Sequence, residues 1–274
     1  MVSRLRKILN LRQIGHTGTL DPLAIGVLPV CIGNATKIIQ YLDTSKAYRA
    51  YVLLGVKTDT YDTEGKILEK KPVKLEVEKI KELLEGFQGE IIQTPPIYSA
   101  VHYKGKRLYE YARKNIEIKD IPSRQVTVNS IELVDIEKAD TKNPVLVVDI
   151  DCSGGTYIRS IAHDLGEKLG YGACLENLTR TKSGKLRVED SLTLEQVEEL
   201  FQNNETEKFL LPSGNFLELE AVEINQEEKD KIKHGQFLPI KNYAAEMMQL
   251  IYKGNLVAIA KSEEGKIKPV KVFC

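Results

Sequence analysis

A single acidic residue lies in a glycine-containing loop whose flanks are basic. Residues 15–22 read GHTGTLDP, and the first forty residues contain five bases and no acid except Asp21. Nearby cations favour the ionised form of a carboxyl group, and a carboxylate nucleophile must be ionised. Pro22 favours an extended backbone at Asp21. The spacing alone also allows an ordinary turn, because aspartate is a common turn residue.

The distribution of charge favours an anionic partner, although the formal net charge is zero. Residues 95–130 contain seven bases and three acids, whereas residues 186–230 contain thirteen acids and three bases. A chain with a basic region and an acidic flank can bind phosphate on one face and remain neutral overall. Taken alone, these charge runs are equally consistent with solvated surfaces.

Composition restricts the class of protein. The chain has 274 residues, 42% of them hydrophobic and 28% charged, which is typical of a soluble globular protein. No apolar run is long enough for a membrane-spanning helix, and the N-terminus lacks the pattern of a secretory signal. The four cysteines contain no Cys-x-x-Cys pair, so we expect neither a zinc site nor disulfides, and a cytoplasmic location. Three cysteines are expected to be buried, and Cys274 to be a thiol in the tail.

Helices and strands must position the loop. Val2, Leu5 and Leu9 form an apolar stripe on a first helix that has no capping residue. Further helices are predicted over residues 35–42 with Asn34 as cap, over 76–85 and 156–169, and from Thr193 to about residue 201. Strands are predicted over residues 26–33, 48–55, 125–135 and 144–151, with 65–69 as the hairpin partner of 48–55.

The C-terminal segment, residues 213–274, reads as a small β-rich domain. A hairpin is predicted from residues 250–252 and 256–260, followed by a strand over 267–273. The irregular alternation of strands and helices before it predicts an α+β fold with a mixed, largely antiparallel sheet flanked by helices. A doubly wound parallel sheet is not favoured.

Residues 15–30, GHTGTLDPLAIGVLPV, closely resemble the signature of the TruB family of pseudouridine synthases. Residues 46–60, 153–160 and 175–184 are similar to later motifs of that family, in the same order. Residues 94–124 are similar to its inserted RNA-gripping thumb. The resemblance covers essentially the whole chain. It implies a pseudouridine-synthase catalytic domain over residues 1–212 and a PUA-like RNA-binding domain over 213–274.

The resemblance also implies roles for individual residues. Asp21 matches the nucleophile, and Arg159 matches the arginine that pairs with it. His16 matches the residue that fills the space left by the flipped base, and Tyr48 matches the tyrosine that stacks on that base. Three further matches are the pocket-lining Tyr157 and Leu178, and Lys37, which lies near the RNA or the pocket.

The activity that the resemblance implies is isomerisation of the T-loop uridine of tRNA, position 55, to pseudouridine. Neither a metal nor an organic cofactor is implied. The expected partner is the T-arm of tRNA, with no membrane, no obligate protein partner and a monomeric state. Three alternatives are an RNA-guided relative inside a ribonucleoprotein, a tRNA-binding folding helper with secondary or lost catalysis, and a generic RNA-binding module.

Two departures from the family pattern concern stability and RNA contact. Relatives often carry an arginine where this chain has Thr179, so one phosphate contact is expected to be weaker. The family usually has a strand and a Lys-Pro-x-Gly turn ahead of the first helix, whereas Met1 falls where that helix is already under way. We expect this difference to expose apolar surface and an unpaired strand edge.

Overall fold

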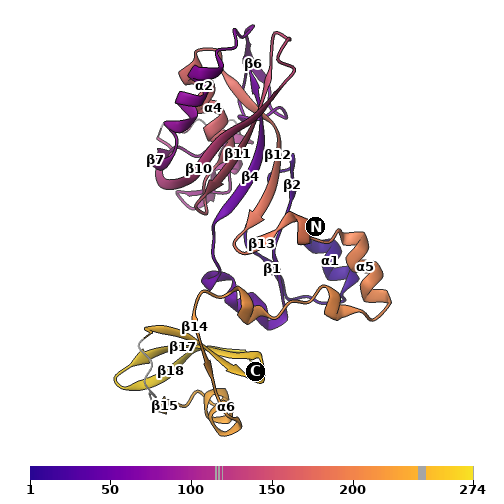
Figure 1. The fold of residues 1–274 in the computed structure, drawn as a ribbon, viewed down its shortest axis with the longest axis vertical. Coiled ribbons are helices and arrows are strands. Elements are labelled where there is room, and N and C mark those ends of the chain that lie inside the picture. The colour runs from indigo at the N-terminus through magenta and orange to yellow at the C-terminus, as the bar shows by residue number, and fades with distance from the viewer. Residues whose placement is uncertain (115, 117, 119, 240–244, 274) are drawn as a thin grey trace.

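A seven-stranded sheet forms the larger part of the computed structural model, which describes residues 1–114, 116, 118, 120–239 and 245–273 (Figure 1). Its strand order is β13-β12-β4-β11-β10-β7, and β2 adds to β12. Only the pairing of β2 with β12 is parallel, so the prediction of a mixed, largely antiparallel sheet is confirmed. The strands are β2 (Ala24–Gly26), β4 (Lys46–Leu54), β7 (Gly89–Gln93), β10 (Arg124–Glu137), β11 (Val145–Cys152), β12 (Ala173–Ser183) and β13 (Leu186–Arg187).

Two helices, α2 (Val77–Glu85) and α4 (Ile158–Leu169), pack against this sheet and against each other. The strands turn alternate apolar side chains towards the helices, as Ala50, Val52 and Leu54 of β4 do. Both helices were predicted, at residues 76–85 and 156–169, and both are confirmed. Gly170 ends α4 in the left-handed conformation that glycine adopts readily.

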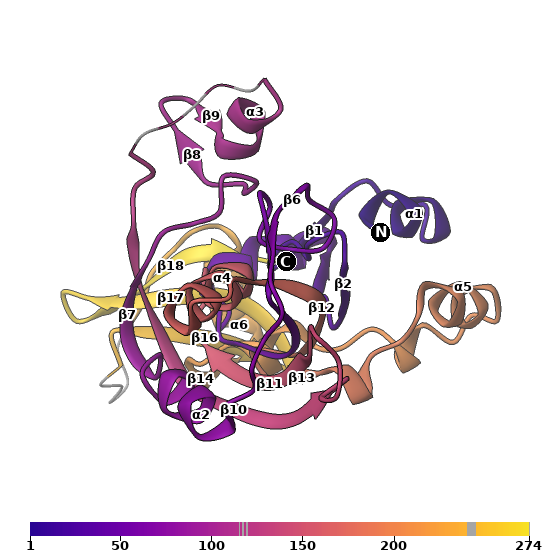
Figure 2. The same ribbon diagram turned by 90° about the horizontal axis from the view of Figure 1, so that it is seen from above.

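An insertion between β7 and β10 projects away from the sheet (Figure 2). It contains β8 (His102–Tyr103), β9 (Lys106–Arg107) and α3 (Leu108–Ala112). Its small core includes the buried side chain of Leu108, and the hydroxyl of Tyr111 donates to the Tyr103 carbonyl at 3.0 Å. The insertion falls within residues 94–124, of which 115, 117 and 119 lie outside the described residues.

A separate five-stranded sheet with its own apolar core occupies the C-terminal region. The predicted hairpin and last strand are confirmed as β16, β17 and β18. Helix α6 (Gln226–Lys233) packs on this sheet and is capped by Asn225. The strands are β14 (Glu220–Glu223), β15 (Leu238–Pro239), β16 (Met247–Tyr252), β17 (Asn255–Glu263) and β18 (Lys266–Val272), in the order β14-β16-β17-β18-β15.

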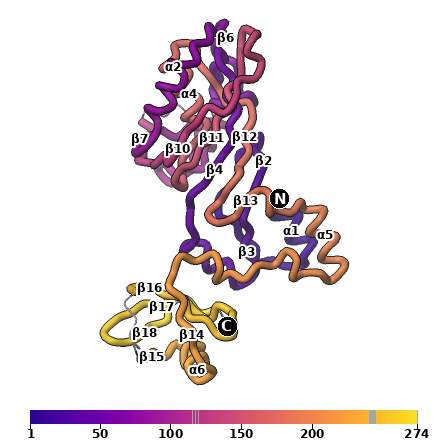
Figure 3. Tube along the Cα trace, in the orientation of Figure 1, coloured from indigo at the N-terminus to yellow at the C-terminus, as the bar shows by residue number. Residues whose placement is uncertain are grey.

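The segment between β3 (Val30–Ile32) and β4 lies where the two parts meet and packs against the C-terminal one (Figure 3). It forms the 3-10 helix η1 (Gly33–Tyr41), whose Ile38 packs with Leu217 and Ile259 of the C-terminal region. The predicted helix at residues 35–42 is therefore present but of the 3-10 type, and its Asn34 cap is wrong. The Asn34 amide instead donates to the carbonyl of Phe273 at 3.0 Å, because the last strand is packed beside it.

Two strand predictions are corrected by the structure. Residues 65–69 do not pair with β4, whose neighbours are β11 and β12. Instead β6 (Ile67–Lys70) pairs with β5 (Val56–Thr58), because Gly55, with a φ of +76°, turns the chain out of the sheet. Residues 26–33 form no single strand, since β2 pairs with β12 while β3 pairs with β1 (Ile14–His16).

The first helix, α1 (Val2–Ile8), lacks a side-chain cap, as predicted. Its apolar stripe is nevertheless covered, because Leu5 and Leu9 are both only 6% exposed. They pack in a cluster with residues of α5 (Leu194–Gln202), which Thr193 caps as predicted. The expected exposure of this stripe is therefore wrong for Leu5 and Leu9. Three short 3-10 turns complete the described elements: η2 (Val188–Asp190), η3 (Thr206–Lys208) and η4 (Ser213–Phe216).

The cysteine prediction is confirmed where the structure describes the chain. Cys31, Cys152 and Cys174 are buried free thiols, and Cys274 lies outside the described residues. Within the described ranges, no helix combines the length and apolar character needed to cross a bilayer.

Replacing Gly26 by alanine should lower the melting temperature by several degrees. Gly26 has a φ of +107°, and an added Cβ would overlap the backbone of Arg180, which cannot turn aside as a side chain could. Gly33→Ala is the matched control, since its φ is +58° but an added Cβ meets nothing within 4 Å. The control should cost only the conformational penalty of about 1–2 kcal/mol. Equal melting temperatures of the two variants in calorimetry would contradict this reading.

Candidate active site

Asp21 lies in the loop that connects β1 and β2, and both ends of this loop are anchored. The backbone N–H of Thr17 donates to the Pro29 carbonyl at 3.3 Å, and that of Ala24 donates to the Asp21 carbonyl at 2.9 Å. Gly18 adopts a φ of +152° within the loop. The arrangement presents the Asp21 side chain, which is 32% exposed, at the edge of the sheet.

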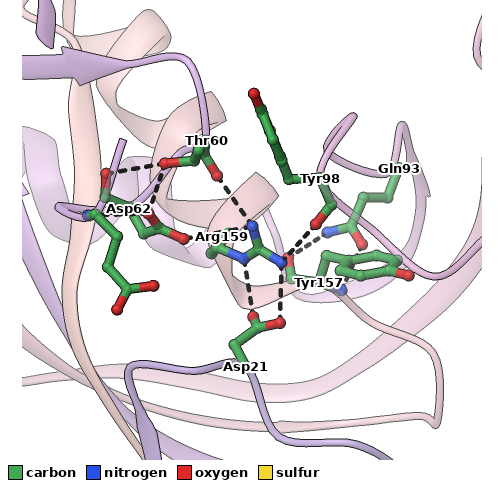
Figure 4. A network of polar contacts seen from close by, with 8 residues as sticks. Asp21, Thr60, Asp62, Gln93, Tyr98, Tyr157 and Arg159 are labelled. Atoms are coloured by element: carbon green, nitrogen blue, oxygen red, sulfur yellow. Dashed lines mark hydrogen bonds and ion pairs between the residues drawn. The ribbon is translucent and has the colours of Figure 1, made fainter. Parts of the chain in front are cut away.

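The Asp21 carboxylate accepts two parallel hydrogen bonds from one guanidinium (Figure 4). Arg159 Nε donates to Oδ2 at 2.8 Å, and Nη2 donates to Oδ1 at 2.9 Å. Fork-to-fork pairs of this kind fix the plane of the carboxylate as well as its position. The structure thus brings together the two residues that the sequence resemblance paired.

Every N–H group of the Arg159 guanidinium faces an oxygen. Besides the two bonds to Asp21, Nη1 donates to the Thr60 carbonyl and Nη2 to the Tyr98 carbonyl, each at 3.1 Å. The fifth oxygen is Oδ2 of Asp62, 3.4 Å from Nη1. The Arg159 side chain is only 5% exposed, so these contacts replace the water that it would otherwise bind.

Asp62 is a second acidic residue of the site that sequence reasoning missed. Its side chain is 5% exposed, and its Oδ1 accepts from the Thr60 hydroxyl at 2.5 Å and from the Glu64 N–H at 3.1 Å. Asp62 lies two residues beyond residues 46–60, the second segment that is similar to a family motif. The available signal was an acidic residue in a turn-rich stretch directly after that motif.

Tyr48 lies on β4 beside a pair of buried cations, Arg180 and Lys46, which sequence reasoning left without a role. Burial raises the pKa of Tyr48 to about 12, although the positive charge of Arg180 acts in the opposite direction. Arg180 also donates to the Val27 carbonyl at 2.7 Å and to the Gly18 carbonyl at 3.4 Å. It therefore binds the chain on both sides of Asp21, at Gly18 within the loop and at Val27 just after β2.

Lys46 is 6% exposed and donates to the Ser183 hydroxyl at 2.7 Å. Burial, and then the neighbouring Arg180, lower the pKa of Lys46 to about 8, against the opposing effect of Asp43. These groups make the surroundings of Tyr48 electropositive.

Tyr157 and Leu178 lie on the elements that flank Asp21. Tyr157 immediately precedes α4, and its backbone N–H and carbonyl bond to the Gln93 side-chain amide at 2.7 and 3.0 Å. The guanidinium of Arg124 lies 4.7 Å from the centre of the Tyr157 ring. Leu178 is buried in β12, opposite Ala24 of β2.

Of the remaining two predicted residues, His16 lies at the start of the Asp21 loop and Lys37 lies apart from it. His16 ends β1, and its Nδ1 accepts from the Gly18 N–H at 3.3 Å within the loop. Lys37 donates to the Val272 carbonyl at 3.0 Å, so it bonds to the C-terminal strand and not to the Asp21 cluster. The expected place of Lys37 near the RNA or the pocket stays a prediction.

In the part of the chain that the structure describes, these residues neither belong to a group of metal ligands nor line the cavity near α1. Among the described residues, no three His, Cys, Asp or Glu side chains are grouped to hold a metal ion. A cavity of about 450 Å³ lies between α1, β3 and the chain around Phe209, and it is lined by none of the predicted site residues. The Asp21 cluster is therefore the better candidate for chemistry, because it combines an accessible carboxylate with an oriented cation.

The chain matches two models of one protein family. Residues 6–158 match the family model for the N-terminal domain of TruB family pseudouridylate synthases, and residues 159–220 match that for the C-terminal domain of tRNA pseudouridylate synthase B. The two matches meet inside α4, so their division is not a division of the fold.

Curated relatives and solved structures extend the likeness over the chain. The tRNA pseudouridine synthase B of Heliobacterium mobile is 42% identical over 96% of this chain and 85% of its own length. The tRNA pseudouridine synthase B of Oceanobacillus iheyensis is 41% identical over 99% of this chain and 92% of its own length. A chain in the crystal structure of a Cbf5–Nop10–Gar1 complex superposes with a TM-score of 0.72 at 27% identity, covering 100% of this chain and 80% of that one. The chain therefore belongs to the TruB family of pseudouridine synthases.

Proposed function

We propose that this protein isomerises the T-loop uridine of tRNA, position 55, to pseudouridine, with Asp21 as the nucleophile. The observation that supports this most directly is the Asp21 carboxylate, accessible and held in one plane by Arg159. The full-length similarity to enzymes named tRNA pseudouridine synthase B supports the same substrate class.

The reaction requires the carboxylate to attack the target nucleotide, at ribose C1′ or at uracil C6. The bond between C1′ and N1 then breaks, the uracil turns, and C5 bonds to C1′. The bond between Asp21 and the nucleotide breaks and restores the carboxylate, the C5 proton leaves, and N1 takes up a proton in place of its lost bond to C1′. Atoms and electrons balance within the nucleotide, so neither an oxidant nor a group donor is consumed. In this scheme Arg159 orients Asp21, and Tyr48 stacks on the flipped uracil.

The RNA-binding surface is proposed to include the insertion and the C-terminal domain. Lys104, Lys106 and Arg107 are exposed on the projecting insertion (Figure 2), where cations can contact phosphates. We place the boundary of the PUA-like domain at residues 212 and 213, ahead of η4. For the whole protein we expect a monomer that acts on tRNA in the cytoplasm without an obligate protein partner.

A direct assay tests the proposal. The protein is incubated with an unmodified tRNA transcript, and pseudouridine is mapped through a chemical adduct that stops reverse transcription. A stop is expected at position 55 and should be absent from a transcript with cytidine there. Conversion elsewhere only, or none, would refute the proposed activity. A folding helper would instead refold tRNA without producing any stop, and the oriented Asp21 has no function in that alternative.

Asp21→Asn should abolish pseudouridine formation while tRNA affinity changes little. The amide keeps the shape of the side chain but is a far weaker nucleophile, whereas affinity comes mainly from phosphate and shape contacts. Turnover is measured with excess enzyme, and binding by filter retention. Turnover of Asp21→Asn near the wild-type rate would contradict the proposal that Asp21 is the nucleophile.

Arg159→Lys should slow the single-turnover rate by about a hundredfold or more, because lysine keeps the charge but loses the bidentate fork. Arg49→Lys provides the matched control. Arg49 makes a similar fork with Asp149, at 2.8 and 2.7 Å, but both side chains are 43% exposed and lie away from the Asp21 cluster. The control should keep its rate, and equal losses in both variants would contradict the proposed pairing.

Lys46→Met should change the pH dependence of stability. Because the folded pKa of about 8 lies below the ordinary value of 10.5, the unfolded chain binds more protons between these pH values. Wild-type stability should therefore rise relative to Lys46→Met as pH increases from 8 to 10.5, by about 3 kcal/mol. Urea unfolding at pH 7.5, 9 and 10.5 measures the difference, in which the other titrating groups cancel. A difference independent of pH would show that Lys46 is not buried as a cation.

A further inference from the structure

The turn at residues 58–65 supplies two of the five oxygens around the Arg159 guanidinium. These are the Thr60 carbonyl and the Asp62 carboxylate (Figure 4). The residue between them, Tyr61, has a φ of +65°. An aromatic residue rarely adopts this left-handed conformation, so the surrounding contacts must hold it there.

Backbone contacts hold one side of the turn. The Leu175 N–H of β12 donates to the Tyr61 carbonyl at 2.9 Å, and the Thr63 N–H donates to the Leu175 carbonyl at 3.0 Å. The hydroxyl of Thr58 also donates to the Asp62 carbonyl at 2.7 Å. These bonds fix the backbone of the turn against the sheet.

A ring contact holds the other side of the turn. The ring of Tyr61 stacks on that of His163, with the centroids 3.8 Å apart and the planes at 8°. His163 lies four residues after Arg159 on α4, so both side chains extend from the same face of the helix. One helix face therefore presents the guanidinium and also the ring that contacts the turn facing it.

The surroundings favour a stacked neutral imidazole. Burial lowers the pKa of His163, and the effect of Lys57 has the same direction, whereas Glu167 acts against both. Lys57 and Glu167 form an ion pair of 2.9 Å beside the stack. The buried Nδ1 of His163 has no hydrogen-bond partner among the described residues. Stacking is therefore the contact that orients this ring.

We propose that the Tyr61–His163 stack is a positioning element of the active site, which holds the Thr60 carbonyl and the Asp62 carboxylate against Arg159. Through Arg159 it sets the orientation of the Asp21 carboxylate. The effect on catalysis rests on the proposed function, whereas the stack itself can be tested without any turnover.

Glycine and phenylalanine substitutions separate the effect of the ring from the effect of the backbone strain at Tyr61. Tyr61→Gly removes the ring but accepts the positive φ without strain, and His163→Ala removes the other ring. Both variants should lose about tenfold in single-turnover rate with tRNA affinity changed less than about twofold, because misplaced catalytic groups cost rate more than binding. Tyr61→Phe and His163→Phe keep a stack and should recover most of the rate. Asn204→Gly, at a remote residue with a φ of +59°, should keep the wild-type rate.

A titration of the four histidines by NMR provides a readout that does not depend on activity. The NMR signal of His163 is assigned as the one that is missing from the spectrum of His163→Phe. In the wild type, the pKa of His163 should lie below the ordinary range of histidine. In Tyr61→Gly its pKa should move towards the ordinary value, because removal of the Tyr61 ring exposes the imidazole.

The two readouts distinguish the possible failures. Wild-type protein that makes no pseudouridine refutes the proposed function, while the titration still reports on the stack. An unchanged His163 titration in Tyr61→Gly, or full activity of that variant, refutes the positioning role. Equal rate losses in Tyr61→Phe and Tyr61→Gly would also refute it, since the hydroxyl and not the ring would then matter.

Discussion

The guanidinium of Arg159 has five N–H groups, and in this fold each of them faces an oxygen. Three segments far apart in the chain supply these oxygens: the Asp21 loop, the turn that contains Thr60 and Asp62, and the segment at Tyr98. A buried arginine without such partners would be strongly destabilising. The requirement to satisfy this one cation therefore holds the three segments at a common point.

Two carboxylates share that cation, and their burial differs. Asp62 is 5% exposed and bonds within its own turn. Asp21 is 32% exposed, and among the described residues its side chain bonds only to Arg159. Asp62 thus balances the buried charge, which leaves Asp21 accessible to a substrate. Polar networks of this kind define a single geometry, because removing any member leaves another group unsatisfied.

The sheet supplies the second constraint on the Asp21 loop. Strand β2 extends the edge of the sheet by pairing with β12, and Arg180 of β12 binds the carbonyls of Gly18 and Val27. The loop is therefore held at two points by the sheet and at one point by α4. Arg180 and Lys46 also make this side of the site electropositive, which suits an anionic substrate.

Patterns along the chain were sufficient to predict the α+β class, helices α2, α4 and α5, the C-terminal hairpin, and the pairing of Asp21 with Arg159. These follow from local periodicity, from the Thr193 cap and from long motif similarity, all of which can be read along the chain. Tertiary structure alone decided that β5 and not β4 pairs with β6, that Asn34 bonds to Phe273, and that Asp62 joins the site. Each of these depends on contacts between segments that are distant in the chain. A side chain that could cap a helix or end a turn locally bonds elsewhere when packing brings another partner close to it.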